Sequence, residues 1–166
     1  TGKSTLCVQL AAQFQATGVP EYARTYLESL KREYVLDDMI EIAKGQIAAE
    51  EHGISTTDSY LFCDTDLRVL QVWSEYRFSV CNSFILNQIA KRKYDGYLIT
   101  SPDFPWVPDP LREHPQPELR LYFFNLYKEL VISSGLPFCV VHGNETERFD
   151  QATQFVSQYF SNVDET

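Results

Sequence analysis

The sequence predicts an α/β protein in which a parallel sheet is covered by helices on both faces. Short apolar runs of strand length, at residues 60–63, 97–100 and 138–141, alternate along the chain with stretches that carry apolar residues at helical spacing. Polar and acidic side chains fall where such strands end, which is the edge where open parallel sheets bind ligands.

The composition describes a folded, acidic protein. The 166 residues suffice for one buried core, and we expect residues 1–166 to form a single domain. With 14 Lys and Arg against 23 Asp and Glu the net charge is −9, so general binding of nucleic acid is not expected. No apolar run approaches the roughly 18 residues of a membrane helix, and we expect no signal peptide. We therefore expect a cytoplasmic protein without membrane or nucleic-acid partners.

The cysteines and histidines do not predict a metal site. None of the four cysteines belongs to a C-x-x-C pair, and Cys63 and Cys139 lie inside apolar runs. We expect buried, reduced thiols rather than a disulfide or a metal centre. The three histidines are scattered and lack metal-ligand spacing, so they are expected to be structural or to lie at the surface.

The chain begins inside a phosphate-binding motif. Residues Thr1-Gly2-Lys3-Ser4-Thr5 match the end of the P-loop pattern G-x-x-x-x-G-K-[ST], whose first glycine would lie upstream of Thr1. We therefore expect the first strand of the sheet to be absent from this chain. Gly2 allows the backbone to approach a phosphate, and the N–H groups of residues 2–5 then cradle it. Lys3 would contact the β- and γ-phosphates of ATP, and the Ser4 hydroxyl would bind Mg²⁺. The structural alternative is a helix start capped by Ser or Thr.

The rest of the chain predicts the following elements in order. Leu6, Leu10 and Phe14, with Val8 and Ala11, form an apolar helical face, and Gly18 is expected to stop that helix. The later helices are expected over residues 22–32, from a cap at Asp37-Asp38 to near Gly53, and over 66–78, 82–93 and 118–134. A last helix is predicted by Ala152, Phe155, Val156, Tyr159 and Phe160, and residues 101–118 form a Pro-rich loop.

Two carboxylates follow the strand at residues 60–63. Asp64 is a candidate Mg²⁺ ligand or a base for a substrate hydroxyl, and Asp66 is a candidate substrate ligand. The structural alternative for either residue is the N-cap of the next helix, a position that Asp favours.

Glu21 and Arg24 follow another strand end. Glu21 comes just after Val19-Pro20, where the second strand of a P-loop kinase ends, and can accept a proton from an attacking hydroxyl. The alternative is a solvated acid stabilised by the helix dipole. Arg24 is a candidate substrate ligand, or else a surface partner of Glu21 or Glu28.

The long loop after residue 100 is expected to be functional. Trp106 offers a flat apolar surface to an aromatic ring, and Arg112 can reach the oxygens of a phosphoryl group in transfer. With Asp109 as a further substrate ligand, these residues describe a lid that excludes water. The alternative is a rigid surface loop with Trp106 packed on the core.

Four motifs occur in a characteristic order: Gly2-Lys3-Ser4-Thr5, Glu21-Tyr22-Ala23-Arg24, Asp64-Thr65-Asp66, and Asp103-x-Pro105-Trp106-x-x-Asp109-x-x-Arg112. In this set the sequence resembles the ribosylnicotinamide kinase domain of NadR-type proteins, a P-loop ATPase/kinase family, from Thr1 to about residue 157. The first motif is generic, and the other three are more specific to the family.

The resemblance implies a five-stranded parallel sheet, ATP with Mg²⁺ as phosphoryl donor, and nicotinamide riboside as acceptor. By position, Lys3 and Ser4 would hold the phosphates and the metal, with Asp64 beside the riboside and Glu21 as a competing base. Trp106, Asp109 and Arg112 would come from the lid, and Lys3 and Arg112 would offset the developing charge.

Alternatives to this assignment stay open at the level of the sequence. One is a kinase of another nucleoside or nucleotide, and another is a regulatory P-loop ATPase that is not a kinase. NadR-type proteins also carry an adenylyltransferase domain and sometimes a DNA-binding domain. This sequence shows no trace of either, so a role as DNA regulator is not supported.

Overall fold

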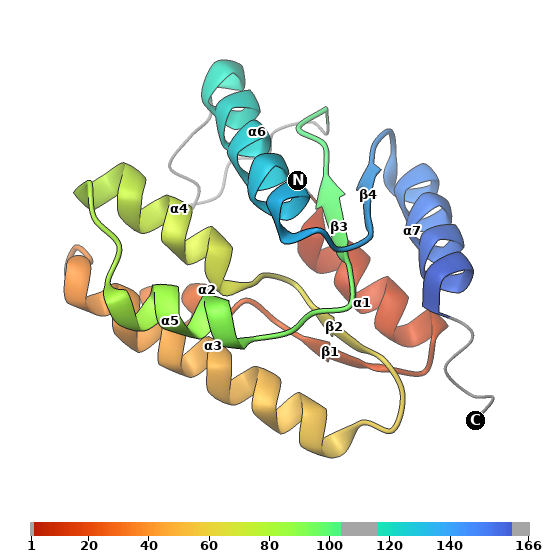
Figure 1. Cartoon of the computed structure of the whole chain (residues 1–166), viewed down its shortest axis with the longest axis horizontal. Coiled ribbons are helices and arrows are strands. Elements are labelled where there is room, and N and C mark those ends of the chain that lie inside the picture. The colour runs from red at the N-terminus through yellow and green to blue at the C-terminus, as the bar shows by residue number, and fades with distance from the viewer. Residues whose placement is uncertain (1, 104–115, 161–166) are drawn as a thin grey trace. The chain divides into compact units, whose positions relative to one another are not determined.

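The computed structural model describes residues 2–103 and 116–160, which form seven helices and four strands (Figure 1). The chain divides into two compact units, which are considered separately below. The central unit comprises residues 11–93, and the terminal unit comprises residues 1–10 and 94–166.

The first helix crosses from the terminal to the central unit. Helix α1 (Lys3–Gln13) buries Leu6 and Leu10 as expected, but Val8 is 69% exposed and does not belong to the buried face. The helix ends at Gln13, and the following turn places Gln15 at φ 50°. Gly18 does not stop it, because Gly18 lies within strand β1 (Thr17–Val19).

The central unit is built on one parallel strand pair. Strand β1 pairs with β2 (Leu61–Cys63), and Val19 lies opposite Cys63. The helices are α2 (Tyr22–Ser29), α3 (Leu36–Thr56), α4 (Leu67–Phe78) and α5 (Ser83–Lys91). Their core consists of Ala23, Met39, Ile42, Ala43, Leu67, Leu70 and Ile85.

Helix α3 differs at both ends from the expected helix. Its N-cap is Val35, so Asp37 and Asp38 lie in the first turn rather than at the cap. The Asp38 carboxylate, three residues after the N-cap, accepts the Val35 N–H at 2.7 Å. The backbone N–H of the N-cap residue therefore has a hydrogen-bond acceptor. The helix also continues past Gly53 to Thr56. A Cβ at residue 53 would lie 2.6 Å from Leu61 Cδ1, so glycine is placed there by close packing on β2.

The terminal unit is built on a second parallel pair. Strands β3 (Tyr97–Thr100) and β4 (Phe138–Val141) pair along their full length and have the predicted bounds. Helix α6 (Pro117–Ser134) contacts β3 and α7 (Glu145–Phe160) contacts β4 (Figure 1). Ile99, Val141 and Ala152 are buried in this unit, and Phe160 closes over Gly96, where a Cβ would lie 2.7 Å from the ring.

The four cysteines are free thiols, but they are half-buried rather than fully buried. Burial raises the pKa of Cys81 to about 11 and also raises that of Cys139, so both thiols stay protonated at neutral pH. Within the described part of the chain, no helix combines the length and apolar character that a membrane crossing requires.

Candidate active site

The start of α1 has the backbone form of a phosphate-binding turn. Gly2 has φ +75°, a left-handed conformation that glycine adopts without strain. The Leu6 N–H donates to the Gly2 carbonyl at 3.0 Å, so residues 3–5 form the first helical turn. The first N–H groups of a helix have no carbonyl acceptor within it, and Ser4 and Thr5 are exposed there. This arrangement suits an anion. Phosphate binding by Gly2, Lys3, Ser4 and Thr5 stays a prediction.

In the central unit, Glu21 and Asp64 follow the ends of two adjacent parallel strands. The Asp64 N–H donates to the Val19 carbonyl at 2.9 Å, which extends the β1–β2 ladder by one residue. Glu21 follows Val19 by two residues and is half-buried, whereas Asp64 is 9% exposed. The two carboxylates are therefore brought to the same edge of this strand pair.

The capping alternative holds for Asp66 and not for Asp64. Asp66 is the N-cap of α4, and its side chain accepts the Arg68 N–H at 3.0 Å. It also forms an ion pair of 3.2 Å with the Arg68 guanidinium. Burial raises the pKa of Asp66, and the contacts with Arg68 oppose that effect. A contact of Asp66 with substrate stays a prediction.

Glu21 directly precedes α2, and Arg24 lies on the first turn of that helix. Glu21 occupies the N-cap position, but its side chain makes no capping hydrogen bond. Arg24 is exposed and pairs with Glu28 one turn further along, at 3.7 Å. The surface pair that the sequence offered as an alternative is thus present, and pairs of this kind contribute little to stability.

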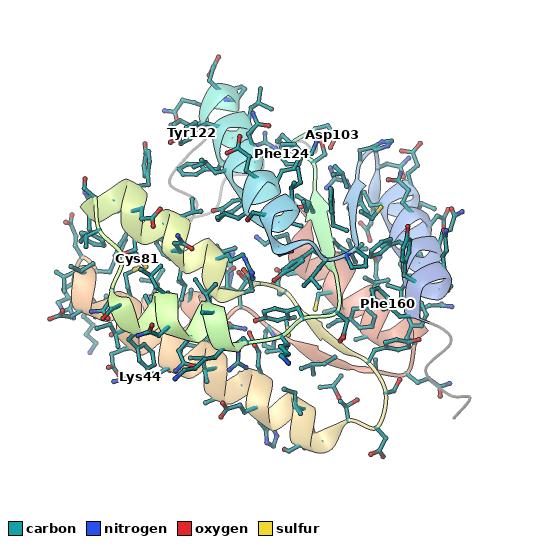
Figure 2. All side chains as sticks on the ribbon, viewed as in Figure 1. Lys44, Cys81, Asp103, Tyr122, Phe124 and Phe160 are labelled. Atoms are coloured by element: carbon teal, nitrogen blue, oxygen red, sulfur yellow. The ribbon has the colours of Figure 1, made fainter. Side chains whose placement is uncertain are left out.

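The first residues of the loop after β3 are anchored within the terminal unit. Arg148 is 3% exposed, and its guanidinium donates to the carbonyls of Gly143 at 2.8 Å and Ser101 at 3.0 Å. It also pairs with Asp103, which is labelled in Figure 2. The Asp103 carboxylate accepts the Gly143 N–H at 2.8 Å. Burial raises the pKa of Asp103, but the Gly143 hydrogen bond and the charge of Arg148 hold it below its ordinary value. Trp106, Asp109 and Arg112 lie outside the described residues.

Sequence reasoning missed a set of buried polar side chains beside Glu21. The Tyr22 N–H donates to Gln46, which contacts Glu50, and Glu50 pairs with Arg92. The available signal was the pair of polar residues four apart on the apolar face of α3. The described residues contain no group of three or more His, Cys, Asp or Glu side chains that could hold a metal.

Comparison with known proteins gives matches over most of the chain. A family model described as an AAA domain matches residues 1–148. Two curated relatives, each named trifunctional NAD biosynthesis/regulator protein NadR, come from Salmonella typhimurium and Escherichia coli. They are 26% identical over 167 and 165 residues, covering 95% of this chain and 40% of each relative. The chain therefore spans less than half the length of these relatives.

Solved structures give the same result at the level of the fold. A crystal structure of NadR protein in complex with NAD and AMP-PNP matches with a TM-score of 0.76 at 22% identity, covering 100% of this chain and 48% of that one. A NadR crystal structure in complex with NR matches with a TM-score of 0.75 at 23% identity, covering 99% and 49%. The predicted P-loop kinase-like α/β fold and the resemblance to NadR-type proteins are confirmed. The expected five-stranded sheet is not seen, because the strands of the described residues form two separate parallel pairs.

Proposed function

We propose that this chain, which belongs to the AAA-domain family, is an ATP-dependent kinase that phosphorylates nicotinamide riboside to nicotinamide mononucleotide. The observation that carries the proposal is the placement of Glu21 and Asp64 after adjacent parallel strands. The NadR relatives, and a NadR structure that contains NR, support the choice of acceptor.

The phosphoryl donor would be held at the start of α1. Lys3 would contact the β- and γ-phosphates, and the N–H groups of the first turn would bind the phosphate oxygens. The Ser4 hydroxyl and the Asp64 carboxylate each stay a predicted oxygen ligand of Mg²⁺, an ion that is commonly held by one or two protein oxygens together with phosphates and water. Bound Mg²⁺ would neutralise negative charge on the phosphates.

The two carboxylates, Glu21 and Asp64, would act on the acceptor hydroxyl. Glu21 or Asp64 would orient the 5′-hydroxyl of the riboside and take its proton as the oxygen attacks the γ-phosphorus, whose bond to the β–γ bridging oxygen breaks so that ADP leaves. Arg112 remains the predicted source of positive charge from the loop. Its removal is expected to lower turnover more than ATP affinity if it acts mainly in the transition state.

The test is an acceptor panel. The full-length protein is incubated with γ-labelled ATP, Mg²⁺, nicotinamide riboside, and a series of nucleosides and deoxynucleosides. Label on nicotinamide riboside supports the proposal. Label only on another nucleoside replaces the acceptor, and release of free phosphate alone points to a regulatory ATPase.

A further inference from the structure

Two of the most buried side chains of α3 are polar. Gln46 is 1% exposed and Glu50 is 2% exposed, and they lie one helical turn apart in the central unit. The Gln46 amide nitrogen, Nε2, donates to Glu50 Oε1 at 3.2 Å. Burial of an amide and a carboxylate is unfavourable unless each is hydrogen-bonded, so their partners define what this pair does.

Arg92 sets the orientation of Glu50. It directly follows α5, is 13% exposed, and donates from Nε and Nη2 to Glu50 Oε2 at 3.1 and 2.9 Å. Glu50 Oε1 is then directed to Gln46. An ionised carboxylate can only accept hydrogen bonds, so Gln46 must turn its NH₂ group toward Glu50 and its carbonyl oxygen away from it.

The Gln46 carbonyl oxygen reaches the start of α2. It accepts the Tyr22 N–H at 3.0 Å, one of the helix-start donors that has no acceptor within the helix. The Tyr22 ring lies against Gly45, where a Cβ would be 2.0 Å from ring atom Cε1. Neighbouring residues of α3 therefore hold Tyr22 by both its backbone and its ring.

We infer that Gln46 and Glu50 are positioning residues for Glu21. Glu21 precedes Tyr22, and the Tyr22 N–H belongs to the peptide group that joins the two residues, so the Gln46 contact fixes that peptide. The Glu21 side chain makes no capping hydrogen bond. The backbone position of Glu21 beyond β1 is therefore set by the Gln46 contact and by the packing of the Tyr22 ring. The catalytic consequence rests on the proposed function, whereas the anchoring of Tyr22 does not.

The chain offers a matched control on the same helix. Asp38 is also a buried carboxylate of α3, at 3% exposed, and it accepts the Tyr26 hydroxyl at 2.6 Å and the Val35 N–H at 2.7 Å. Asp38 thus contacts α2 at Tyr26, one turn after Tyr22, and neither of these two hydrogen bonds involves Tyr22. Asp38→Asn thus perturbs the same two helices without removing the Gln46 contact.

The experiment compares Gln46→Met, Glu50→Gln and Asp38→Asn in the full-length protein. Amide hydrogen exchange at Tyr22 is measured relative to the rest of α2, with steady-state kinetics for ATP and nicotinamide riboside. In Gln46→Met we expect at least about tenfold faster exchange at Tyr22 and a tenfold or greater loss of kcat/KM for the riboside, with KM for ATP within about twofold of wild type. Glu50→Gln removes the charge that orients Gln46. We therefore expect this variant, like Gln46→Met, to show faster exchange at Tyr22 and a lower kcat/KM for the riboside.

Three results would overturn the inference. Unchanged exchange at Tyr22 in both variants refutes the anchor. Faster exchange, with a loss of riboside kcat/KM no larger than in Asp38→Asn, refutes the positioning role. Absence of phosphoryl transfer by the wild-type protein refutes the proposed function and the role of Glu21, while the exchange data still decide the anchor. If Gln46→Met does not fold, Glu50→Gln supports the same comparison.

Discussion

At the scale of single residues, the candidate site depends on a few groups whose local structure follows from simple rules. Gly2 adopts a left-handed conformation before a helix, and Asp66 caps the helix that follows β2. Asp64 is not the cap of that helix. One strand end thus carries two acidic residues with different surroundings, a distinction that spacing alone does not reveal.

Lys3 gives the first prediction. Lys3→Met keeps an unbranched side chain that is one atom shorter and removes the charge, so phosphoryl transfer should fall at least about 100-fold. The control is Lys44→Met, because Lys44 lies on α3 (Figure 2) and pairs with exposed Glu41 at 2.8 Å. Transfer is measured with labelled ATP. A Lys3→Met protein that retains a third of the wild-type rate contradicts the assignment.

Asp66 gives the second prediction, which concerns stability. Asp66→Ala removes the cap of α4 and should lower the free energy of unfolding by about 1 kcal/mol. Asp66→Asn keeps a capping oxygen, and burial already disfavours the charged form, so it should stay within about 0.5 kcal/mol of wild type. Urea unfolding followed by tryptophan fluorescence checks both values. Equal losses in the two variants argue against a capping role.

At the scale of elements, polar side chains on α3 hold α2 in place at two points. Gln46 contacts the first residue of α2, and Asp38 accepts a hydrogen bond from Tyr26 further along it. Asp38 also forms an ion pair of 2.7 Å with Arg32, which follows α2. Helix α2 has only eight residues, so these tertiary contacts, rather than helix propensity, determine where it lies.

Asp38 gives a prediction with a defined pH dependence. The Arg32 hydrogen bonds, helped by those from Tyr26 and Val35, hold the pKa of Asp38 well below its usual 3.8 despite its burial. A carboxyl group whose pKa is lower in the folded state stabilises the fold above its unfolded pKa and loses that effect as the pH falls. Wild type should therefore exceed Asp38→Asn in unfolding free energy by about 1–3 kcal/mol at pH 7.

The difference between the two proteins should shrink as the pH falls from about 5 toward 3. Urea unfolding of both proteins at pH 7, 5, 4 and 3 measures it. A difference that stays constant over this range would show that the ionised form of Asp38 is not what stabilises the fold.

At the scale of the whole molecule, the sequence predicted most elements because their signals are local. Residues 97–100 and 138–141 are apolar strand-length runs and have the predicted bounds. The apolar run at residues 60–63 likewise predicted that Asp64 follows a strand, whereas the strand before Glu21 was expected from its place in a P-loop kinase. The match to NadR structures confirms the fold class, which rests on the alternation of strands and helices.

The errors arose where distant contacts decide the structure. The sequence predicts helix ends at Gly18 and near Gly53, but Gly18 lies in a strand and Gly53 provides space for Leu61. Gln46 and Glu50 escaped notice because a polar residue in a helix is ordinarily assigned to its exposed face. Their partners, Tyr22 and Arg92, lie 24 and 42 residues away in the sequence, and only the folded chain brings them together.

The most direct test of the central claim measures phosphoryl transfer to nicotinamide riboside by Glu21→Gln and Asp64→Asn proteins at saturating ATP and Mg²⁺. Both variants replace a carboxylate with an amide of nearly the same shape, and ATP affinity is measured alongside. The account predicts that at least one variant loses about 100-fold or more in kcat, the scale of general-base catalysis, while Glu21→Gln still binds ATP. Transfer at wild-type rates by both variants would contradict the account.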